Sequence, residues 1–235
     1  SLPFVLYIQA LRGRPMLLVN DWQVRTFISL LVLFSLILAY WLMWRDNVPW
    51  STALRLAAFN VTSIITTTGY AVTDYTDWGN FDIVALYFLT FVGGCSGSTA
   101  GGLKIYRLLV LMHSCHLSMR RLIRPNGVFS AKYNGKPITI EAIGTVSAFV
   151  VVYTATIVLL AMGLAMTGLD FATSLSGAAT AVANVGPGIG TVIGPAGNFA
   201  SLSDTAKWLL CLGMILGRLE IYTLAVLVAP DFWRR

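Results

Sequence analysis

Charged residues are scarce in this sequence. Asp, Glu, Lys and Arg make up 11% of its 235 residues, and 57% of the residues are hydrophobic. Soluble domains carry about 25% charged residues. So few charges cannot cover a water-soluble fold with a core of this size. The composition therefore argues against a soluble enzyme or binding module and predicts a membrane protein that contacts lipid.

Residues that hold metals or form disulfides are also few. The sequence has two histidines and three cysteines, and Cys95, Cys115 and Cys211 have no spacing typical of a metal site or a disulfide framework. We expect the cysteines to act as small hydrophobic residues. No signal-peptide pattern and no initiator methionine precede the first apolar run. We therefore expect the chain to be part of a longer polypeptide.

The sequence does contain a repeat. Residues 101–111 reappear as 217–227, with seven of the eleven positions identical. Gly69 and Gly186 each stand in a polar break, 31 or 32 residues before the corresponding copy. Two landmarks that share an offset indicate a duplicated unit of about 115 residues. In an apolar chain, such a repeat is typical of a transport protein whose site lies on a pseudo-symmetry axis.

The first unit is predicted to contain two spans and a short helix. Residues 26–44 carry no charge and can cross the ~30 Å hydrocarbon layer as a helix. Residues 51–65 form a short amphipathic helix that starts at a Ser/Thr cap and leads into the Thr/Gly break. A second apolar helix, 81–92, is interrupted by five glycines within 93–102 and continues over 103–115.

The second unit repeats this order with helices at 139–166, 170–183 and 205–229. The predicted fold is all-α, with two tandem M1–pore helix–M2 repeats that form half of a pseudo-fourfold, potassium-channel-like pore. We divide the chain into a cytoplasmic N-terminal segment (1–25), a first repeat (26–119), a basic cytoplasmic linker (120–138) and a second repeat (139–235).

Basic residues gather on one side of the predicted spans. They are Arg12, Arg14, Arg25, Lys104, Arg107, Arg120, Arg121, Arg124, Lys132, Lys136, Arg234 and Arg235. By the positive-inside rule this side, with both chain ends, is cytoplasmic. The other side gathers Asp46, Asp74, Asp77, Asp82, Asp170 and Asp204. These aspartates either concentrate cations at an outer mouth or cap helices and turns.

Both polar breaks interrupt the backbone at membrane depth. Irregular backbone there must line water, an ion or protein, because unpaired amides and carbonyls are costly in lipid. Potassium channels solve this with a short pore helix and a loop whose carbonyl oxygens replace the ion's hydration shell. Two such loops cannot enclose an ion. Either a second copy of the chain or two further units of the same polypeptide must complete the site.

Four motifs together resemble the TrkH/TrkG/KtrB superfamily of potassium transporters, and TrkH in particular. They are the Thr-Thr-Thr-Gly-Tyr loop at 66–70, the glycine string at 93–104, the loop at 184–188 and residues 217–220. The glycine string is the most specific of them, and the similarity covers nearly the whole chain. In that family one polypeptide carries four M1–pore helix–M2 units around one pore. The resemblance implies that this chain is the third and fourth.

The resemblance also implies ion ligands. Potassium would be bound by the backbone carbonyls of Thr68, Gly69, Val185 and Gly186, with Thr66, Thr67 and Asn184 as supporting filter positions. The alternative for the threonine run is a set of side chains that bond back to helix carbonyls.

The glycine string is implied to be a gate. In the resembled family this intramembrane loop lies under the filter and obstructs the ion path. The gate residues would be Gly93, Gly94, Ser96, Gly97, Ser98, Gly101, Gly102 and Arg218. The alternative is a patch of small residues for close helix packing.

Arg218 stands near the middle of the last apolar run, where a charge is costly and marks a functional position by default. We interpret it as a cation that donates to loop carbonyls and slows passing cations, as the resemblance implies. The alternative is a structural ion pair. Glu220 projects from nearly the opposite helix face and is a poor direct partner. The repeat aligns Lys104 with Glu220, which suggests an ion pair between the units.

The resemblance further implies a location and partners. The full-length protein is expected to be a homodimer in the bacterial inner membrane. A cytosolic nucleotide-binding ring of the TrkA type is expected to dock on the basic face around 120–136.

Two other functions are alternatives to potassium transport. Ser96 in a Gly-Cys-Ser-Gly string, followed by His113 and His116, superficially resembles an intramembrane serine protease. However, about 17 residues of largely helical chain put Ser96 and His113 on the order of 25 Å apart. A cation-coupled secondary transporter with broken helices is the second alternative. Such a site usually holds an acidic coupling residue, and neither pore loop contains one.

Overall fold

The computed structural model describes residues 1–124, 127, 132–133, 136–219 and 233. Apart from one short hairpin, the regular structure in this part of the chain is helical. The elements in chain order are α1 (Phe4–Leu11), α2 (Met16–Asn20), α3 (Trp22–Asp46), α4 (Trp50–Ile65), η1 (Tyr75–Trp78), α5 (Asn80–Thr90), α6 (Ile105–Ile123), β1 (Lys132–Tyr133), β2 (Lys136–Pro137), α7 (Ile140–Met166), α8 (Phe171–Ala183), η2 (Phe199–Ser201) and α9 (Asp204–Arg218).

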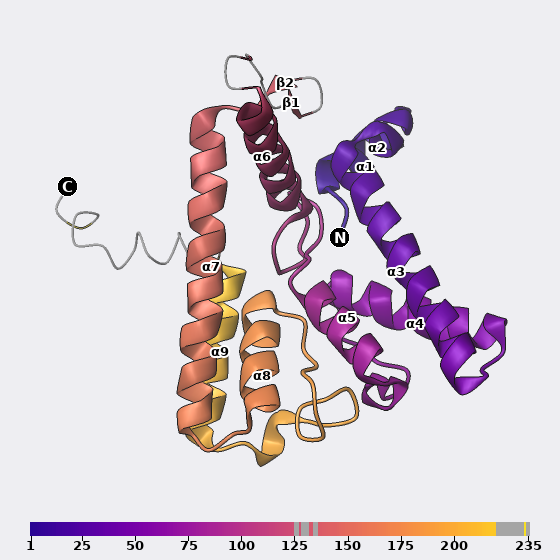
Figure 1. The fold of residues 1–235 in the computed structure, drawn as a ribbon, viewed down its shortest axis with the longest axis vertical. Helices are drawn as coiled ribbons and strands as arrows, with labels where there is room; N and C mark the ends of the chain where they lie inside the picture. The colour runs from indigo at the N-terminus through magenta and orange to yellow at the C-terminus, as the bar shows by residue number, and fades with distance from the viewer. Residues whose placement is uncertain (125–126, 128–131, 134–135, 220–232, 234–235) are drawn as a thin grey trace.

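The helices form two groups that follow the sequence repeat (Figure 1). In the first group, α3 is followed by the short helix α4, a loop, and the broken pair α5 and α6. In the second, α7 is followed by the short helix α8, a loop, and α9. Figure 1 shows α3, α4 and α5 on one side of the molecule and α7, α8 and α9 on the other. The predicted all-α architecture of two tandem M1–pore helix–M2 repeats is confirmed.

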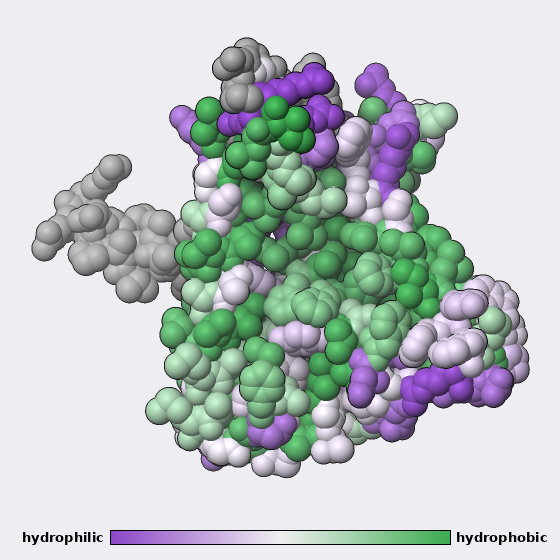
Figure 2. Space-filling model, in the orientation of Figure 1, coloured by the Kyte–Doolittle hydropathy of each residue, from purple (hydrophilic) through white to green (hydrophobic). Residues whose placement is uncertain are grey.

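In the part of the chain that the structure describes, two helices are long and apolar enough to cross a membrane. They are α3, with 25 residues, and α7, with 27, and each has a mean hydropathy of 2.3 over its most apolar window. Only 28% of each window is buried within the chain, so most of the apolar surface points outward. In Figure 2, apolar side chains cover the middle of the molecule, and hydrophilic ones gather at the top and the lower right. This distribution fits a surface that faces lipid.

The pore helix of the first repeat packs closely on α3. Ala53, Ala57, Val61 and Ile65 recur at four-residue intervals in α4, and all are fully buried. Residues four apart lie on one face of a helix, and the small alanines let the two backbones approach. The close approach holds the end of α4, and therefore the Thr/Gly break, in a fixed position.

The pore helix of the second repeat lies between α7 and α9. Small residues occupy the buried positions of this helix, and Ala178, Ala179 and Val182 are fully buried. Asp170 caps the helix, because its carboxylate accepts a hydrogen bond from the Thr173 N–H at 3.1 Å.

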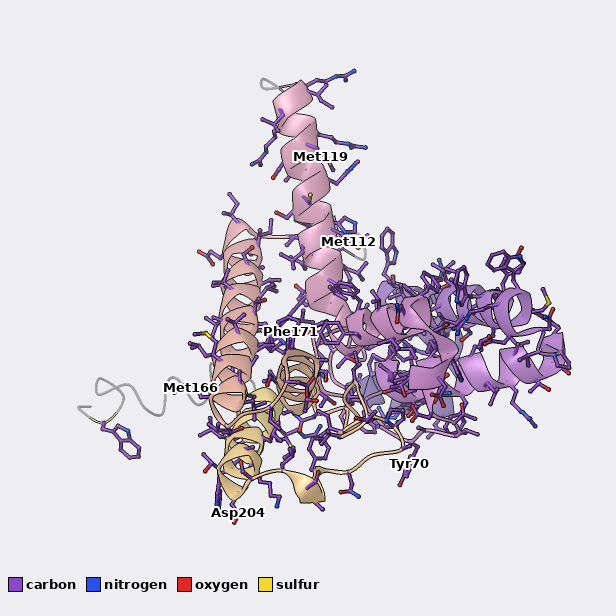
Figure 3. The ribbon with its side chains drawn as sticks, turned by 60° about the horizontal axis from the view of Figure 1, so that its bottom comes forward. Tyr70, Met112, Met119, Met166, Phe171 and Asp204 are labelled. Atoms are coloured by element: carbon purple, nitrogen blue, oxygen red, sulfur yellow. The ribbon has the colours of Figure 1, made fainter. Side chains whose placement is uncertain are left out.

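Some helix ends differ from the prediction. The predicted Ser/Thr cap of α4 is wrong, because the helix already begins at Trp50, behind Pro49, with no side-chain cap. Helix α6 continues to Ile123, into residues assigned to the linker, because no Gly or Pro interrupts it before Pro125. Figure 3 shows Met112 and Met119 on the part of α6 that projects from the fold, away from Tyr70. The predicted span 205–229 is described as α9 up to Arg218, and its remainder lies outside the described residues.

Candidate functional site

The two pore loops touch each other. A Cβ added at Gly69 would lie 2.1 Å from the carbonyl oxygen of Val185, and one added at Gly186 would lie 3.7 Å from the Cα of Gly69. Both glycines have positive φ, 78° at Gly69 and 121° at Gly186, which residues with a side chain resist. The repeat therefore brings its two single-glycine breaks together, as a shared ion site requires.

In the first loop, the amides turn back to the pore helix. The N–H groups of Thr68 and Gly69 both donate to the carbonyl of Ser63, at 2.9 Å and 3.3 Å. Thr66 bonds back as well, because its Oγ1 donates to the carbonyl of Thr62 at 2.6 Å and also lies 2.6 Å from Thr68 Oγ1. For Thr66, the sequence-based alternative of bonding back to helix carbonyls is thus observed.

The second loop has the same arrangement, 117 positions later. The N–H of Val185 donates to the carbonyl of Thr180 at 3.1 Å, and the N–H of Gly186 donates to Thr180 Oγ1 at 2.9 Å. Thr180 occupies the position that matches Ser63. In each loop two successive amides donate to one pore-helix residue, although the Gly186 amide uses a hydroxyl acceptor and the loop sequences share only the glycine.

This pattern leaves carbonyl oxygens free. Within the described part of the chain, no hydrogen bond ends on the carbonyls of Thr68, Gly69, Val185 or Gly186. At membrane depth, unpaired carbonyls are costly unless water or an ion takes the place of a donor. These are the four oxygens that the resemblance implied as ligands, and they are chemically suited to replace the hydration shell of a cation.

The glycine string forms a loop whose two ends are joined by backbone hydrogen bonds, and we call this joined part the neck. The N–H of Leu103 donates to the carbonyl of Phe91 at 2.9 Å, and the N–H of Gly93 donates to the carbonyl of Leu103 at 2.8 Å. The neck needs glycine, because a Cβ at Gly93 would lie 2.0 Å from the carbonyl oxygen of Gly101. A pure packing patch would not need such a neck. These backbone bonds join the end of α5 to the start of α6. Residues 95–101 are therefore extruded, which means that they lie outside the path that a continuous helix would follow.

Long side chains hold the extruded segment. Lys104 Nζ donates to the carbonyls of Ser98, at 3.0 Å, and Ala100, at 2.5 Å. Arg218 Nη1 donates to the carbonyl of Thr99 at 2.5 Å. Three successive loop carbonyls are thus bonded by two cations. Arg218 therefore contacts the loop that the resemblance implies to be the gate.

The cations line a cavity next to the loop. Its volume is about 350 Å³, and its walls include the loop, Arg107, Arg218 and the aromatic rings of Phe149 and Tyr153. The Arg107 guanidinium lies 3.7 Å from the centre of the Phe149 ring, a cation–π contact. Glu220, the suggested partner of Lys104, lies outside the described residues, so that pair remains a prediction.

Sequence reasoning missed three further contacts of this region. The N–H of Ser96 donates to Oε1 of Gln23, a buried side chain in α3, at 2.8 Å. Residues at the start of the chain also reach the site: the carbonyl of Ser1 accepts the N–H of Cys95 at 2.9 Å, and Ser1 Oγ donates to the carbonyl of Thr66 at 3.3 Å. No local pattern marks these contacts, because each joins segments that are far apart in sequence.

Two of the outer aspartates, Asp74 and Asp170, act as caps. Asp74 accepts the N–H of Thr76 at 2.9 Å at the start of η1. Hydrogen bonds from Thr173 hold the pKa of Asp170 below its usual range. Asp82 is fully buried in the first turn of α5, and it does not cap that helix.

His113 is engaged elsewhere. The His113 ring nitrogen Nδ1 lies 2.8 Å from the carbonyl of Leu109, one turn earlier in α6, and the ring packs against Trp22 with centroids 5.8 Å apart. Ser96 lies in the loop and is held by its backbone to Gln23. These separate sets of contacts do not suggest a nucleophile and base.

Known proteins resemble the whole chain. The family model of TrkH, described as a cation transport protein, matches residues 9–235. The Trk system potassium uptake protein TrkI of Halomonas elongata is 54% identical over all 235 residues, which cover 48% of that protein. The potassium uptake protein TrkH of Escherichia coli is 35% identical over 97% of this chain and 47% of its own length.

A solved structure agrees with these relatives. The crystal structure of the potassium transporter TrkH from Vibrio parahaemolyticus matches 99% of this chain with a TM-score of 0.91 and 34% identity, and the match covers 50% of that structure. The chain thus spans about half the length of the relatives it matches. These relatives are potassium transporters and not enzymes, so the protease alternative is rejected.

Proposed function

Because the chain belongs to the TrkH family of cation transport proteins, we propose that it supplies two of the four M1–pore helix–M2 units of a potassium uptake pore. The relatives are named as potassium uptake proteins, and the chain spans about half of their length. The remaining two units, on the same polypeptide, would close the pseudo-fourfold ring. A second copy of the chain is the less favoured source, because the relatives are single chains of about twice this length.

The observation that carries the proposal is the pair of pore loops. Their amides bond to the pore helices, and the carbonyls of Thr68, Gly69, Val185 and Gly186 accept no hydrogen bond from the described residues. Each loop would contribute one quarter of a carbonyl cage for a dehydrated potassium ion, which is the transported substrate. Thr66, Thr67 and Asn184 would hold the loops in shape.

The intramembrane loop would be the gate. Residues 95–101 are extruded from the M2 helix on a closed neck and are held by Lys104 and Arg218. A loop in this place obstructs ions until it withdraws, and the Arg218 guanidinium adds a repulsive charge beside the path. Withdrawal would break a few side-chain bonds and leave the neck intact.

The location and partners are proposed from the family resemblance, and the orientation is proposed from the charge distribution. The protein would lie in a bacterial inner membrane with its basic side in the cytoplasm. Arg120, Arg121 and Arg124 are exposed at the projecting end of α6, where a cytosolic nucleotide-binding regulator of the TrkA type would dock. The full-length protein would act as a homodimer.

Growth of a potassium-uptake-deficient host tests the proposal. The full-length protein should restore growth on low potassium, and variants of Gly69 or Gly186 should not, although they insert equally. Flux into proteoliposomes without a proton or sodium gradient separates a channel-like pore from a coupled secondary transporter. Potassium entry under these conditions supports the pore, and strict dependence on a second gradient contradicts it.

A further inference from the structure

Gly101 of the intramembrane loop contacts both repeats, at the first pore loop and at the second pore helix. The buried Gly101 donates its backbone N–H to Oγ1 of Thr67 in the first pore loop, at 2.9 Å. A Cβ at Gly101 would lie 2.1 Å from the carbonyl oxygen of Ala183, the last residue of α8. The loop backbone is thus bonded to one pore loop and packed against the pore helix of the other repeat.

The backbone of Thr67 is unusual. Its φ of 55° lies in the left-handed region, which is a genuine outlier for a β-branched residue. Such conformations persist only where surrounding contacts impose them. The bond to Gly101 is one of these contacts, and it acts on the residue directly before Thr68, whose carbonyl is a proposed ion ligand.

The matching residue of the second repeat has a different kind of hydrogen-bond partner. Asn184 occupies the matching position with φ 56°, and its Nδ2 donates to the carbonyl of Met214 in α9 at 3.2 Å. Asparagine tolerates the left-handed region, and its partner belongs to a regular helix. In the first repeat the partner is the extruded loop, which lies between α5 and α6 and belongs to neither helix.

We propose that the Thr67 hydroxyl couples the selectivity filter to the gate, so that the filter binds potassium more tightly when the loop is in place. This inference rests on the proposed function. Withdrawal of the loop breaks the bond to Gly101 and lets the strained backbone of Thr67 relax, which moves the carbonyl of Thr68. Because coupling is reciprocal, potassium in the filter must stabilise the closed loop by the same factor.

Thiol labelling of the full-length protein in detergent measures this coupling without using transport. Thr99→Cys places a reporter on the exposed part of the loop, in a background with Cys95→Ala, Cys115→Ser and Cys211→Ser. Potassium chloride, compared with choline chloride at equal ionic strength, should slow labelling. One neutral hydrogen bond corresponds to about a two- to tenfold effect.

Thr67→Val removes the acceptor and keeps the branched shape, so potassium should no longer change the labelling rate. Thr67→Ser keeps the hydroxyl and should restore the effect. Thr67→Ala serves if the valine variant does not insert. Thr156→Val removes a threonine hydroxyl that bonds only within α7 and is the matched control.

Two results overturn the coupling. One is an equal potassium effect in Thr67→Val and in the parent. The other is a parent that transports potassium selectively but labels at the same rate in both salts. Both differ from failure of the proposed function, in which the parent shows no selective potassium uptake.

Discussion

The guanidinium of Arg218 donates a hydrogen bond to the backbone carbonyl of Thr99, 119 positions earlier in the chain. The bond joins the end of α9 in the second repeat to the extruded loop of the first. In the sequence repeat, Arg218 aligns with Gly102, which has no side chain. The duplication therefore placed a side chain of one unit beside the irregular segment of the other, and this asymmetry is the basis of the gating proposal.

Arg218→Ala is expected to raise potassium flux about tenfold or more and to make it less dependent on the cytosolic regulator. Removing the cation releases the carbonyl of Thr99 and also removes a charge that repels passing ions at short range. Flux into proteoliposomes, normalised to inserted protein, measures the change. Lys207→Ala, at the other end of α9, is the matched control. Flux that falls in proportion to lost protein would identify Arg218 as a structural residue only.

Lys104→Met is expected to raise flux in the same direction, because Nζ holds the carbonyls of Ser98 and Ala100. Methionine keeps most of the side-chain length but cannot donate. Since both cations bond one loop, the double variant Lys104→Met/Arg218→Ala should gain less than the two single changes together. Independent, additive gains would mean that the two side chains do not act on a common gate.

Asp170→Ala is expected to lower the free energy of unfolding by about 1 kcal/mol, because the N-cap of the second pore helix is lost. The pKa of Asp170 is lowered in the folded protein, first by its hydrogen bonds to Thr173. Its contribution is therefore fully present above the unfolded pKa of about 3.9 and is lost as the pH falls through the lower folded pKa.

Thermal unfolding in detergent at pH 7 and near pH 3 checks this expectation. Asp170→Asn keeps an acceptor and should retain most of the stability without the acid-dependent loss. If Asp170→Ala and the parent differ equally at both pH values, the carboxylate is not the stabilising group.

Much of the fold could be predicted from local signals. The charge-free run at 26–44 and the apolar runs at 139–166 and 170–183 located three helices to within a few residues. The duplication located both pore loops, because each glycine stands at the same distance from a copied segment. The extra turns of α6 were missed because the change from apolar to basic residues near 120 resembled the end of a helix.

The contacts of the site were less predictable. Gln23 bonds Ser96 across 73 positions, and Thr67 bonds Gly101 across 34. Such pairs depend on how helices pack and leave no spacing signal. For Lys104, the alignment with Glu220 suggested a partner in the other unit, and that pair stays a prediction. The bonds of Lys104 to carbonyls four and six positions away in its own loop were not predicted.

Ion selectivity of three alanine variants tests the central claim, that the two single-glycine loops form the potassium site. In Gly69→Ala the alanine must adopt a positive φ, and its Cβ would lie 2.1 Å from the carbonyl oxygen of Val185. In Gly186→Ala only the backbone conformation is unfavourable, at a cost of about 1–2 kcal/mol. Gly168→Ala has the same kind of backbone, with φ 90°, but lies outside the loops in open space and is the control.

The measurement is potassium over sodium uptake by the full-length protein in proteoliposomes, at matched insertion. The account predicts that selectivity is lost in Gly69→Ala, reduced in Gly186→Ala and unchanged in Gly168→Ala. Parental selectivity in both loop variants would contradict it, because the carbonyls of these loops could then not be the ligands.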